Sequence, residues 1–265
     1  MENNFVLQIK NLKKKYRSNN TIFFNKKYFY PVNDVTFQIN YGQTLGLVGE
    51  SGCGKSTLGK CILKLTDIDG GEIFFDSKNI TKFSQNQMRT IRKDLQVIFQ
   101  DPYSSLNPRM SIKNILEEPF KIFNIHKDKD HLISEILNLL DCVSLPKDSL
   151  EKFPHQFSGG QRQRICIARA IAFNPKLIIC DESISALDVS IQAQIVNLLM
   201  DLQKKFGIAY LFISHDLRMV RFISDKIAVM NYGKIVEYEN SEEIFENPKN
   251  EYTKKLLSSI PKYIF

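Results

Sequence analysis

The most restrictive feature of the sequence is the glycine-rich segment Gly49-Glu-Ser-Gly-Cys-Gly-Lys-Ser-Thr57, which follows an apolar run at Thr44–Val48. It fits the pattern Gly-x4-Gly-Lys-Ser/Thr. It also lies between a predicted strand and a helix predicted from Lys55 to about Lys64, which is the context that this pattern requires. Glycines let a backbone wrap around an anion with its N–H groups directed inward, and the start of a helix adds positive potential. The segment therefore predicts a phosphate-binding loop in an α/β fold.

Side chains in this loop have separate expected roles. We expect Lys55 to reach the β- and γ-phosphates of a nucleotide, and the Ser56 hydroxyl to bind Mg²⁺. A thiol at the start of a helix should have a lowered pKa, so we expect Cys53 to be acidic and its alkylation to block nucleotide binding. The candidate nucleotide contacts are Gly49, Glu50, Ser51, Gly52, Cys53, Gly54, Lys55, Ser56 and Thr57.

The rest of the chain alternates between apolar strands and amphipathic helices. Further strands are predicted at Val6–Ile9, Val32–Ile39, Glu72–Phe75, Leu95–Phe99, Leu177–Cys180, Ile208–Ile213, Lys226–Met230 and Lys234–Glu237. Further helices are predicted at Ile112–Phe123, His131–Leu140, Ser158–Phe173, Ile191–Phe206, Glu242–Glu246 and Tyr252–Ser259. This alternation predicts a largely parallel sheet covered by helices. We expect one domain over 1–265, with a helical subdomain inserted at 101–157 and a short helical extension at 238–265.

Length, hydropathy and charge restrict the class of protein. A chain of 265 residues with 43% hydrophobic residues suits one α/β domain. No apolar run approaches the roughly 18 residues that span a bilayer, and the start lacks the pattern of a secretory signal. We therefore expect a cytoplasmic protein that meets a membrane only through partners. The net charge of +7 includes clusters at Lys13–Arg17 and Lys26–Lys27, for which a solvated loop is favoured over a polyanion-binding arm.

A carboxylate pair follows the apolar run Leu177–Cys180. Open α/β sheets bind ligands at the carboxyl ends of their strands, so Asp181 and Glu182 are expected at such an end. A lone Asp-Glu pair would more often cap a following turn, but the phosphate loop favours a catalytic role. We expect Asp181 to hold a metal through water and Glu182 to polarise the attacking water.

The segment Ser158-Gly-Gly-Gln161 fits a capping box that starts a helix. Two glycines in a first helical turn cost about 1 kcal/mol each relative to alanine. Their presence indicates that the backbone approaches something closely. Because helix starts bind phosphates, we expect this segment to contact the γ-phosphate of a nucleotide held by a facing domain.

The three segments Gly49–Thr57, Phe157–Gln161 and Ile178–Glu182, in this order, resemble the ATP-binding subunit of an ABC transporter. The resemblance implies the ABC ATPase fold: a phosphate-loop core with a mainly parallel sheet, an antiparallel N-terminal β part and an inserted helical subdomain. It implies ATP and Mg²⁺ as cofactors and ATP hydrolysis as the activity. It also implies a head-to-tail dimer, in which Ser158, Gly159, Gly160 and Gln161 complete the site of the partner.

Further site residues are implied by the same resemblance. Gln100 is expected to contact metal and water, and His215 to contact the γ-phosphate. Asp188 ends the segment Ser185–Asp188, which matches the loop that faces the dimer partner. The family also stacks an N-terminal aromatic residue on adenine; Tyr16 fits best, and Tyr28 and Tyr30 compete with it.

Several longer segments resemble oligopeptide, dipeptide and nickel importers. They are Gln100–Met110, Glu117–Pro119, Pro154–Ser158, Glu246–Pro248 and Tyr252-Thr253. In those systems two different ATPase subunits drive two membrane subunits that are fed by an extracytoplasmic binding protein. The resemblance thus implies an ATPase at the cytoplasmic face of the cell membrane that powers import of peptides or of nickel or metal chelates. It implies no nucleic-acid partner.

Two other readings remain. A soluble ATPase of the same superfamily that acts on ribosomes or DNA usually carries two ATPase domains, coiled-coil arms or zinc cysteines, which this sequence does not show. A nucleotide-binding module without hydrolysis would require a broken site, whereas Lys55, Gln100, Glu182 and His215 are all present. The transported substrate and the choice between a homodimer and a heterodimer stay open, because both depend on other subunits.

Overall fold

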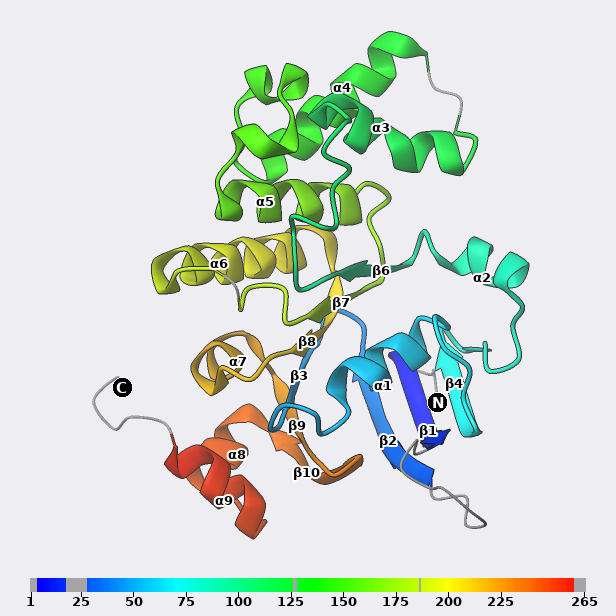
Figure 1. The fold of residues 1–265 in the computed structure, drawn as a ribbon, viewed down its shortest axis with the longest axis vertical. Coiled ribbons are helices and arrows are strands. Elements are labelled where there is room, and N and C mark those ends of the chain that lie inside the picture. The colour runs from blue at the N-terminus through cyan, green and yellow to red at the C-terminus, as the bar shows by residue number, and fades with distance from the viewer. Residues whose placement is uncertain (1–3, 18–27, 126–127, 186, 260–265) are drawn as a thin grey trace.

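The computed structural model describes residues 4–17, 28–125, 128–185 and 187–259. In these residues the strands form two sheets (Figure 1). The smaller sheet is antiparallel, with the order β2-β1-β4-β5. Its strands are β1 (Phe5–Arg17), β2 (Tyr28–Asn40), β4 (Gly70–Phe75) and β5 (Lys78–Asn79). The expected N-terminal antiparallel part is therefore confirmed.

The larger sheet has the strand order β10-β9-β3-β8-β7-β6 in the described residues. Four strand pairs are parallel: β9 with β3, β3 with β8, β8 with β7, and β7 with β6. Strand β10 pairs antiparallel with β9. The strands are β3 (Thr44–Val48), β6 (Leu95–Ile98), β7 (Leu177–Asp181), β8 (Ala209–Ile213), β9 (Lys226–Asn231) and β10 (Lys234–Asn240). The predicted mainly parallel sheet is thus confirmed.

Helices cover both faces of the larger sheet (Figure 1). The α-helices are α1 (Lys55–Ile62), α2 (Gln85–Ile91), α3 (Ile112–Ile122), α4 (Lys129–Cys142), α5 (Gly159–Ala170), α6 (Val189–Phe206), α7 (Leu217–Ile223), α8 (Ser241–Glu246) and α9 (Glu251–Ser258). Two 3₁₀ helices, η1 (Lys147–Glu151) and η2 (Pro154–Gln156), precede α5. Helix α1 lies between the two sheets, and its residues Leu58, Cys61 and Ile62 join the apolar core there.

Strand β8 shows why the strands of the larger sheet are apolar throughout. Successive side chains of a strand point to opposite faces. Leu211 and Ile213 pack into the core that contains α1, whereas Tyr210 and Phe212 pack into a second core with α5 and α6. Because both faces of the strand are covered, no position on it is free for a polar side chain.

Parallel pairing brings three loops to one edge of the larger sheet. Leu47 of β3 pairs with Ile213 of β8, and Ile213 pairs with Asp181 of β7. Strands β3, β7 and β8 therefore end at the same level. The segments that follow them, which begin at Gly49, Glu182 and Ser214, leave the sheet side by side.

Several elements differ from the sequence-based expectation. Strand β1 extends to Arg17, so Lys13–Arg17 lie in a strand and the expected solvated loop is wrong there; Lys26–Lys27 lie outside the described residues. Helices α2 and α7 were not predicted, because seven residues span too few turns for a clear helical period. Among the described residues, no helix is long and apolar enough to cross a membrane.

Candidate nucleotide site

The glycine-rich loop joins β3 to α1, as its pattern predicts. Gly54 has a φ of 118°, and a Cβ atom there would lie 1.8 Å from the backbone oxygen of Pro31 in β2. A side chain at this position is excluded by both conformation and space. The close approach of β2 therefore fixes the path of the loop just before Lys55.

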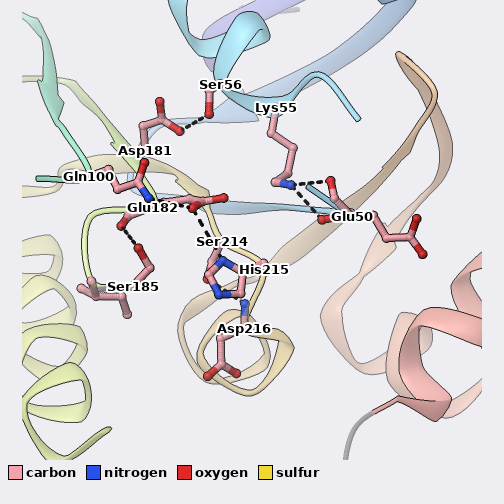
Figure 2. Close-up of polar contacts among 12 residues, drawn as sticks. Glu50, Lys55, Ser56, Gln100, Asp181, Glu182, Ser185, Ser214, His215 and Asp216 are labelled. Carbon is pink, nitrogen blue, oxygen red and sulfur yellow. Dashed lines mark hydrogen bonds and ion pairs between the residues drawn. The ribbon is translucent and has the colours of Figure 1, made fainter. Parts of the chain in front are cut away.

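Lys55 is almost completely buried, with 4% of its surface exposed. Its Nζ donates hydrogen bonds to the backbone oxygen of Gly49 at 2.8 Å and of Glu50 at 3.0 Å (Figure 2). A buried ammonium is costly unless such acceptors compensate its lost hydration. The loop thus carries a positive charge at its centre, held by the loop's own carbonyl groups.

Ser56 and Asp181 come together from α1 and the end of β7. The Ser56 hydroxyl donates a hydrogen bond to Asp181 Oδ1 at 2.9 Å. Burial raises the pKa of the Asp181 carboxyl, and the hydrogen bond from Ser56 opposes this rise. No group of three or more His, Cys, Asp or Glu side chains that could hold a metal occurs in the described part of the chain. One hydroxyl and one carboxylate oxygen nevertheless fit Mg²⁺, which takes hard oxygen ligands and completes its shell with water and phosphate.

Glu182 is the meeting point of three loops (Figure 2). Gln100 Nε2 donates a hydrogen bond to Glu182 Oε2 at 3.3 Å, and His215 Nδ1 lies 3.6 Å from the same oxygen. The backbone of Glu182 is in the left-handed region with a φ of 47°, and its N–H donates to the Ile213 oxygen at 3.0 Å. Such a conformation costs about 1–3 kcal/mol and is typical of functional positions. It turns the carboxylate toward Gln100 and His215.

A cleft of about 350 Å³ lies over the phosphate loop. It is lined by Tyr16, Phe29, Pro31, Ser51, Gly52, Gly54, Lys55, Ser56, Thr57, Gln100 and Glu182. The cleft therefore joins the loop, Gln100 and Glu182 to aromatic residues of β1 and β2. Its lining thus combines cationic, carboxylate and aromatic side chains.

The aromatic wall of the cleft consists of Tyr16 and Phe29, which are directly paired across β1 and β2. Their exposed fractions are 45% and 54%. Tyr28 and Tyr30 flank Phe29 in β2, and because side chains alternate along a strand, neither lines the cleft. Sequence reasoning missed Phe29, because only the pairing register places it opposite Tyr16.

The segment Ser158–Gln161 starts α5 as predicted. The Ser158 hydroxyl accepts from the Gln161 N–H at 3.3 Å, and Gln161 Oε1 accepts from the Ser158 N–H at 3.0 Å. A Cβ atom at Gly160 would lie 2.6 Å from Cγ2 of Ile191 in α6. The close approach that this glycine indicated is therefore made, at least at Gly160, to a helix of the same chain.

Neither Ser158–Gln161 nor Asp188 is among the residues that line the cleft over the phosphate loop. Ser158, Gln161 and Asp188 are exposed, and Asp188 is the N-cap residue of α6. The structure thus separates the predicted site residues into two groups. One group surrounds the phosphate loop, and the other lies outside its cleft.

The expected acidity of Cys53 is wrong. Its thiol is 8% exposed and packs inside the loop, where a Cβ atom on Gly49 would lie 2.8 Å from Sγ. Burial raises the pKa of the Cys53 thiol, and the nearby Lys55 ammonium offsets this only in part. Desolvation of the thiolate outweighs the positive potential of the helix start.

Comparison with known proteins gives consistent matches. A sequence profile of the family described as ABC transporter matches residues 32–185. The oligopeptide transport ATP-binding protein OppF of Bacillus subtilis (strain 168) is 52% identical over 231 residues, which is 87% of this chain and 76% of OppF. The dipeptide transport ATP-binding protein DppF of Lactococcus lactis subsp. cremoris is 52% identical over 87% of this chain and 74% of DppF. The glutathione import ATP-binding protein GsiA of Escherichia coli (strain K12) is 51% identical over 88% of this chain and 37% of GsiA.

Solved structures match across most of the fold. CbiO1 from Clostridium perfringens, part of the ABC transporter complex cbiONQ, superposes with a TM-score of 0.79 at 25% identity and covers 92% of each chain. The ATP-binding cassette MJ0796, solved as a dimer in a post-hydrolysis state with ADP and Pi, gives a TM-score of 0.77 at 26% identity. That match covers 89% of this chain and 98% of MJ0796.

Cys53 should react slowly with alkylating agents in the folded protein, because a raised pKa leaves little thiolate at neutral pH. We expect iodoacetamide at pH 7.5 to label the half-buried Cys142 before Cys53, and both at similar rates in urea. Peptide mass spectrometry over a time course measures both rates in one sample. Labelling of Cys53 ahead of Cys142 in the folded protein would restore the original expectation.

Replacement of Tyr16 by alanine should weaken ATP binding, because it removes half of the aromatic wall. Stacking of a base on an aromatic ring contributes ~1–3 kcal/mol, which corresponds to an increase in Kd of roughly 5- to 150-fold. Tyr28→Ala is the matched control, since Tyr28 lies on the same strand pair but outside the cleft. Equilibrium titration with a fluorescent ATP analogue gives both values. A loss of affinity in the Tyr28 variant alone would contradict the prediction, because adenine would then contact the other face of β2.

Proposed function

The chain belongs to the ABC transporter family and is an ATPase, and we propose that it powers the import of peptides through a membrane complex. The contact that best supports ATP hydrolysis is the convergence of Gln100 and His215 on the Glu182 carboxylate beside the phosphate loop. Support for peptides comes from the 52% identity to ATP-binding proteins named for oligopeptide and dipeptide transport. The cited relatives give no comparable support for nickel or metal chelates.

In this proposal Lys55 keeps the carbonyl oxygen of Gly49 and exchanges that of Glu50 for phosphate oxygens of ATP. The exchange is favoured because an anionic phosphate compensates a buried ammonium better than a neutral carbonyl does. Ser56 and Asp181 would hold Mg²⁺, which neutralises charge on the phosphates. Tyr16, and Phe29 which pairs with it, would stack on adenine in the cleft.

We assign the hydrolytic step to Glu182. Its carboxylate would accept a proton from the attacking water, and Gln100 would orient the water and the metal. His215, at 3.6 Å from the same carboxylate, would donate to the γ-phosphate. The left-handed backbone of Glu182 supports this role, because it fixes the carboxylate where the ends of β3 and β8 deliver the other groups.

Ser158, Gly159, Gly160, Gln161 and Asp188 lie outside the cleft, and we propose that they face the nucleotide of a second ATPase subunit. The helix start at Ser158 is suited to contact a γ-phosphate, because its first N–H groups have no partner within the helix. The similarity to MJ0796, which was solved as a dimer with ADP and Pi, supports this arrangement. The Gly160–Ile191 contact would then set the position of that helix start.

The remaining partners are proposed from the family. The complex would contain two membrane permease subunits and an extracytoplasmic substrate-binding protein, with this chain at the cytoplasmic face of the membrane. Residues 101–157 would form an inserted helical subdomain that transmits closure of the ATPase dimer to the permease. The short helical extension expected at 238–265 begins only at α8, because β10 continues to Asn240; residues 260–265 lie outside the described part of the chain. An ATPase that acts on ribosomes or DNA is not favoured, since the relatives are named for import or transport of small solutes.

Glu182→Gln should retain MgATP binding and reduce the hydrolysis rate by roughly 10²–10⁴-fold, because the amide cannot accept the proton. The comparison requires the assembled complex, with phosphate release and nucleotide binding measured on the same preparation. Glu151→Gln, at an exposed residue of a 3₁₀ helix, is the control for loss of one carboxylate. Hydrolysis at the wild-type rate in Glu182→Gln would remove this residue from the mechanism.

The proposed partners can be identified by purifying a tagged form of the chain from detergent-solubilised membranes. Mass spectrometry should find a second ATPase subunit and two membrane subunits in fixed ratio to the chain. The same preparation from the soluble fraction is the control. Recovery of ribosomal or DNA-bound proteins in their place would favour the alternative function.

A further inference from the structure

The C-terminal helix α9 contacts the phosphate loop directly. The Tyr252 hydroxyl accepts a hydrogen bond from the backbone N–H of Glu50 at 3.0 Å, although the two residues lie 202 positions apart in the sequence. Helices α8 and α9 lie next to β10 at the end of the larger sheet (Figure 1). Tyr252 therefore joins the end of the chain to the loop that precedes α1.

The contact falls on the peptide unit that also holds Lys55. The N–H of Glu50 and the carbonyl of Gly49 belong to one planar peptide group. Tyr252 binds its N–H, and Lys55 Nζ binds its oxygen at 2.8 Å. A planar group with partners on both sides cannot rotate without breaking one of them. The hydroxyl of Tyr252 thus fixes the direction in which the Gly49 carbonyl points, and with it the position of the Lys55 ammonium.

Helix α9 is itself held firmly in place. The Glu237 carboxylate, 9% exposed on β10, accepts from the N–H groups of Lys249 at 2.7 Å and Asn250 at 3.1 Å. Asn250 then caps the helix, with its Oδ1 accepting from the Tyr252 N–H at 2.9 Å. Two hydrogen bonds to one carboxylate and a cap restrict the start of the helix. Tyr252 is therefore presented to the loop from a fixed backbone.

Its hydroxyl is suited to this contact. Burial raises the pKa of Tyr252, and the hydrogen bond from the Glu50 N–H opposes this rise. The neutral phenol keeps its proton at physiological pH and still accepts from a backbone N–H. Phenylalanine at this position would retain the ring and leave the N–H of Glu50 without this partner.

We propose that Tyr252 is a positioning residue for the phosphate loop, and that it makes the ATP affinity of the site depend on the docking of helix α9. The inference rests on the proposed nucleotide site and assigns to the C-terminal helices a role in setting its affinity. Tyr252 acts through the Gly49–Glu50 peptide and Lys55 and is not among the residues that line the cleft.

The test compares Tyr252→Phe with wild type in the full-length chain. Loss of a hydrogen bond worth about 0.5–1.5 kcal/mol should raise the Kd for MgATP by roughly 2- to 12-fold. Hydrogen exchange at the Glu50 amide should become faster in the same variant. Tyr238→Phe is the matched control, because the Tyr238 hydroxyl also forms one hydrogen bond with the backbone away from the loop; it donates to the Gln38 oxygen at 2.9 Å. The Tyr238→Phe variant should lose about as much thermal stability as Tyr252→Phe and still bind MgATP with the wild-type Kd.

A second variant, which changes no residue of the loop, tests whether the docking of α9 affects ATP affinity. Glu237→Gln weakens the anchoring of α9 without touching Tyr252, and it should raise the Kd for MgATP and the exchange rate at Glu50 in the same direction. Wild-type affinity and wild-type exchange at Glu50 in Tyr252→Phe would overturn the inference. Equal weakening by Tyr252→Phe and Tyr238→Phe would also overturn it, since the effect would then be one of general stability. Failure of the wild-type chain to bind MgATP would instead contradict the proposed function.

Discussion

The parallel pairing of β3, β8 and β7 is the constraint on which the rest of the site depends. Leu47 pairs with Ile213, and Ile213 pairs with Asp181, so the three strands end together. The phosphate loop, the Asp181-Glu182 pair and His215 all lie at these strand ends. A shift of one residue in this register would reverse the faces of the strand's side chains, which two separate apolar cores prevent. The apolar packing of the sheet thus sets the geometry of the polar groups at its edge.

Charged side chains gather at this edge of the larger sheet, because its apolar cores cannot hold an unpaired charge. The buried Lys55 ammonium, the Asp181 carboxylate and the Glu182 carboxylate lie within two neighbouring loops, and each is compensated by a hydroxyl, an amide or a carbonyl. Burial of charge without a partner would cost several kcal/mol, so these contacts hold the site in one arrangement. The left-handed conformation of Glu182 is a local cost of about 1–3 kcal/mol that the surrounding sheet sustains. In the proposed function, this arrangement would receive phosphate and metal with little rearrangement.

Helix α9 adds a second layer to this arrangement. The hydrogen bond between Tyr252 and the Glu50 N–H connects the loop to a helix that Glu237 anchors on β10. Helix α9 thus contacts the phosphate loop from outside the cleft, and β1 and β2 contribute the aromatic wall of the cleft. Interactions that reach α9 in a larger complex have a direct physical route to Lys55.

By itself the sequence determined those features that depend on local spacing. The glycine pattern between Thr44–Val48 and Lys55 predicted a strand, a loop and a helix, and the Ser158–Gln161 spacing predicted a helix cap; both are present. Tertiary structure alone decided features that depend on register and burial. Phe29 faces the cleft because it pairs with Tyr16, and the Cys53 thiol is desolvated because the loop folds over it. Tyr252 meets Glu50 because the tertiary fold places α9 beside the phosphate loop, and no local pattern encodes a contact between residues 202 positions apart.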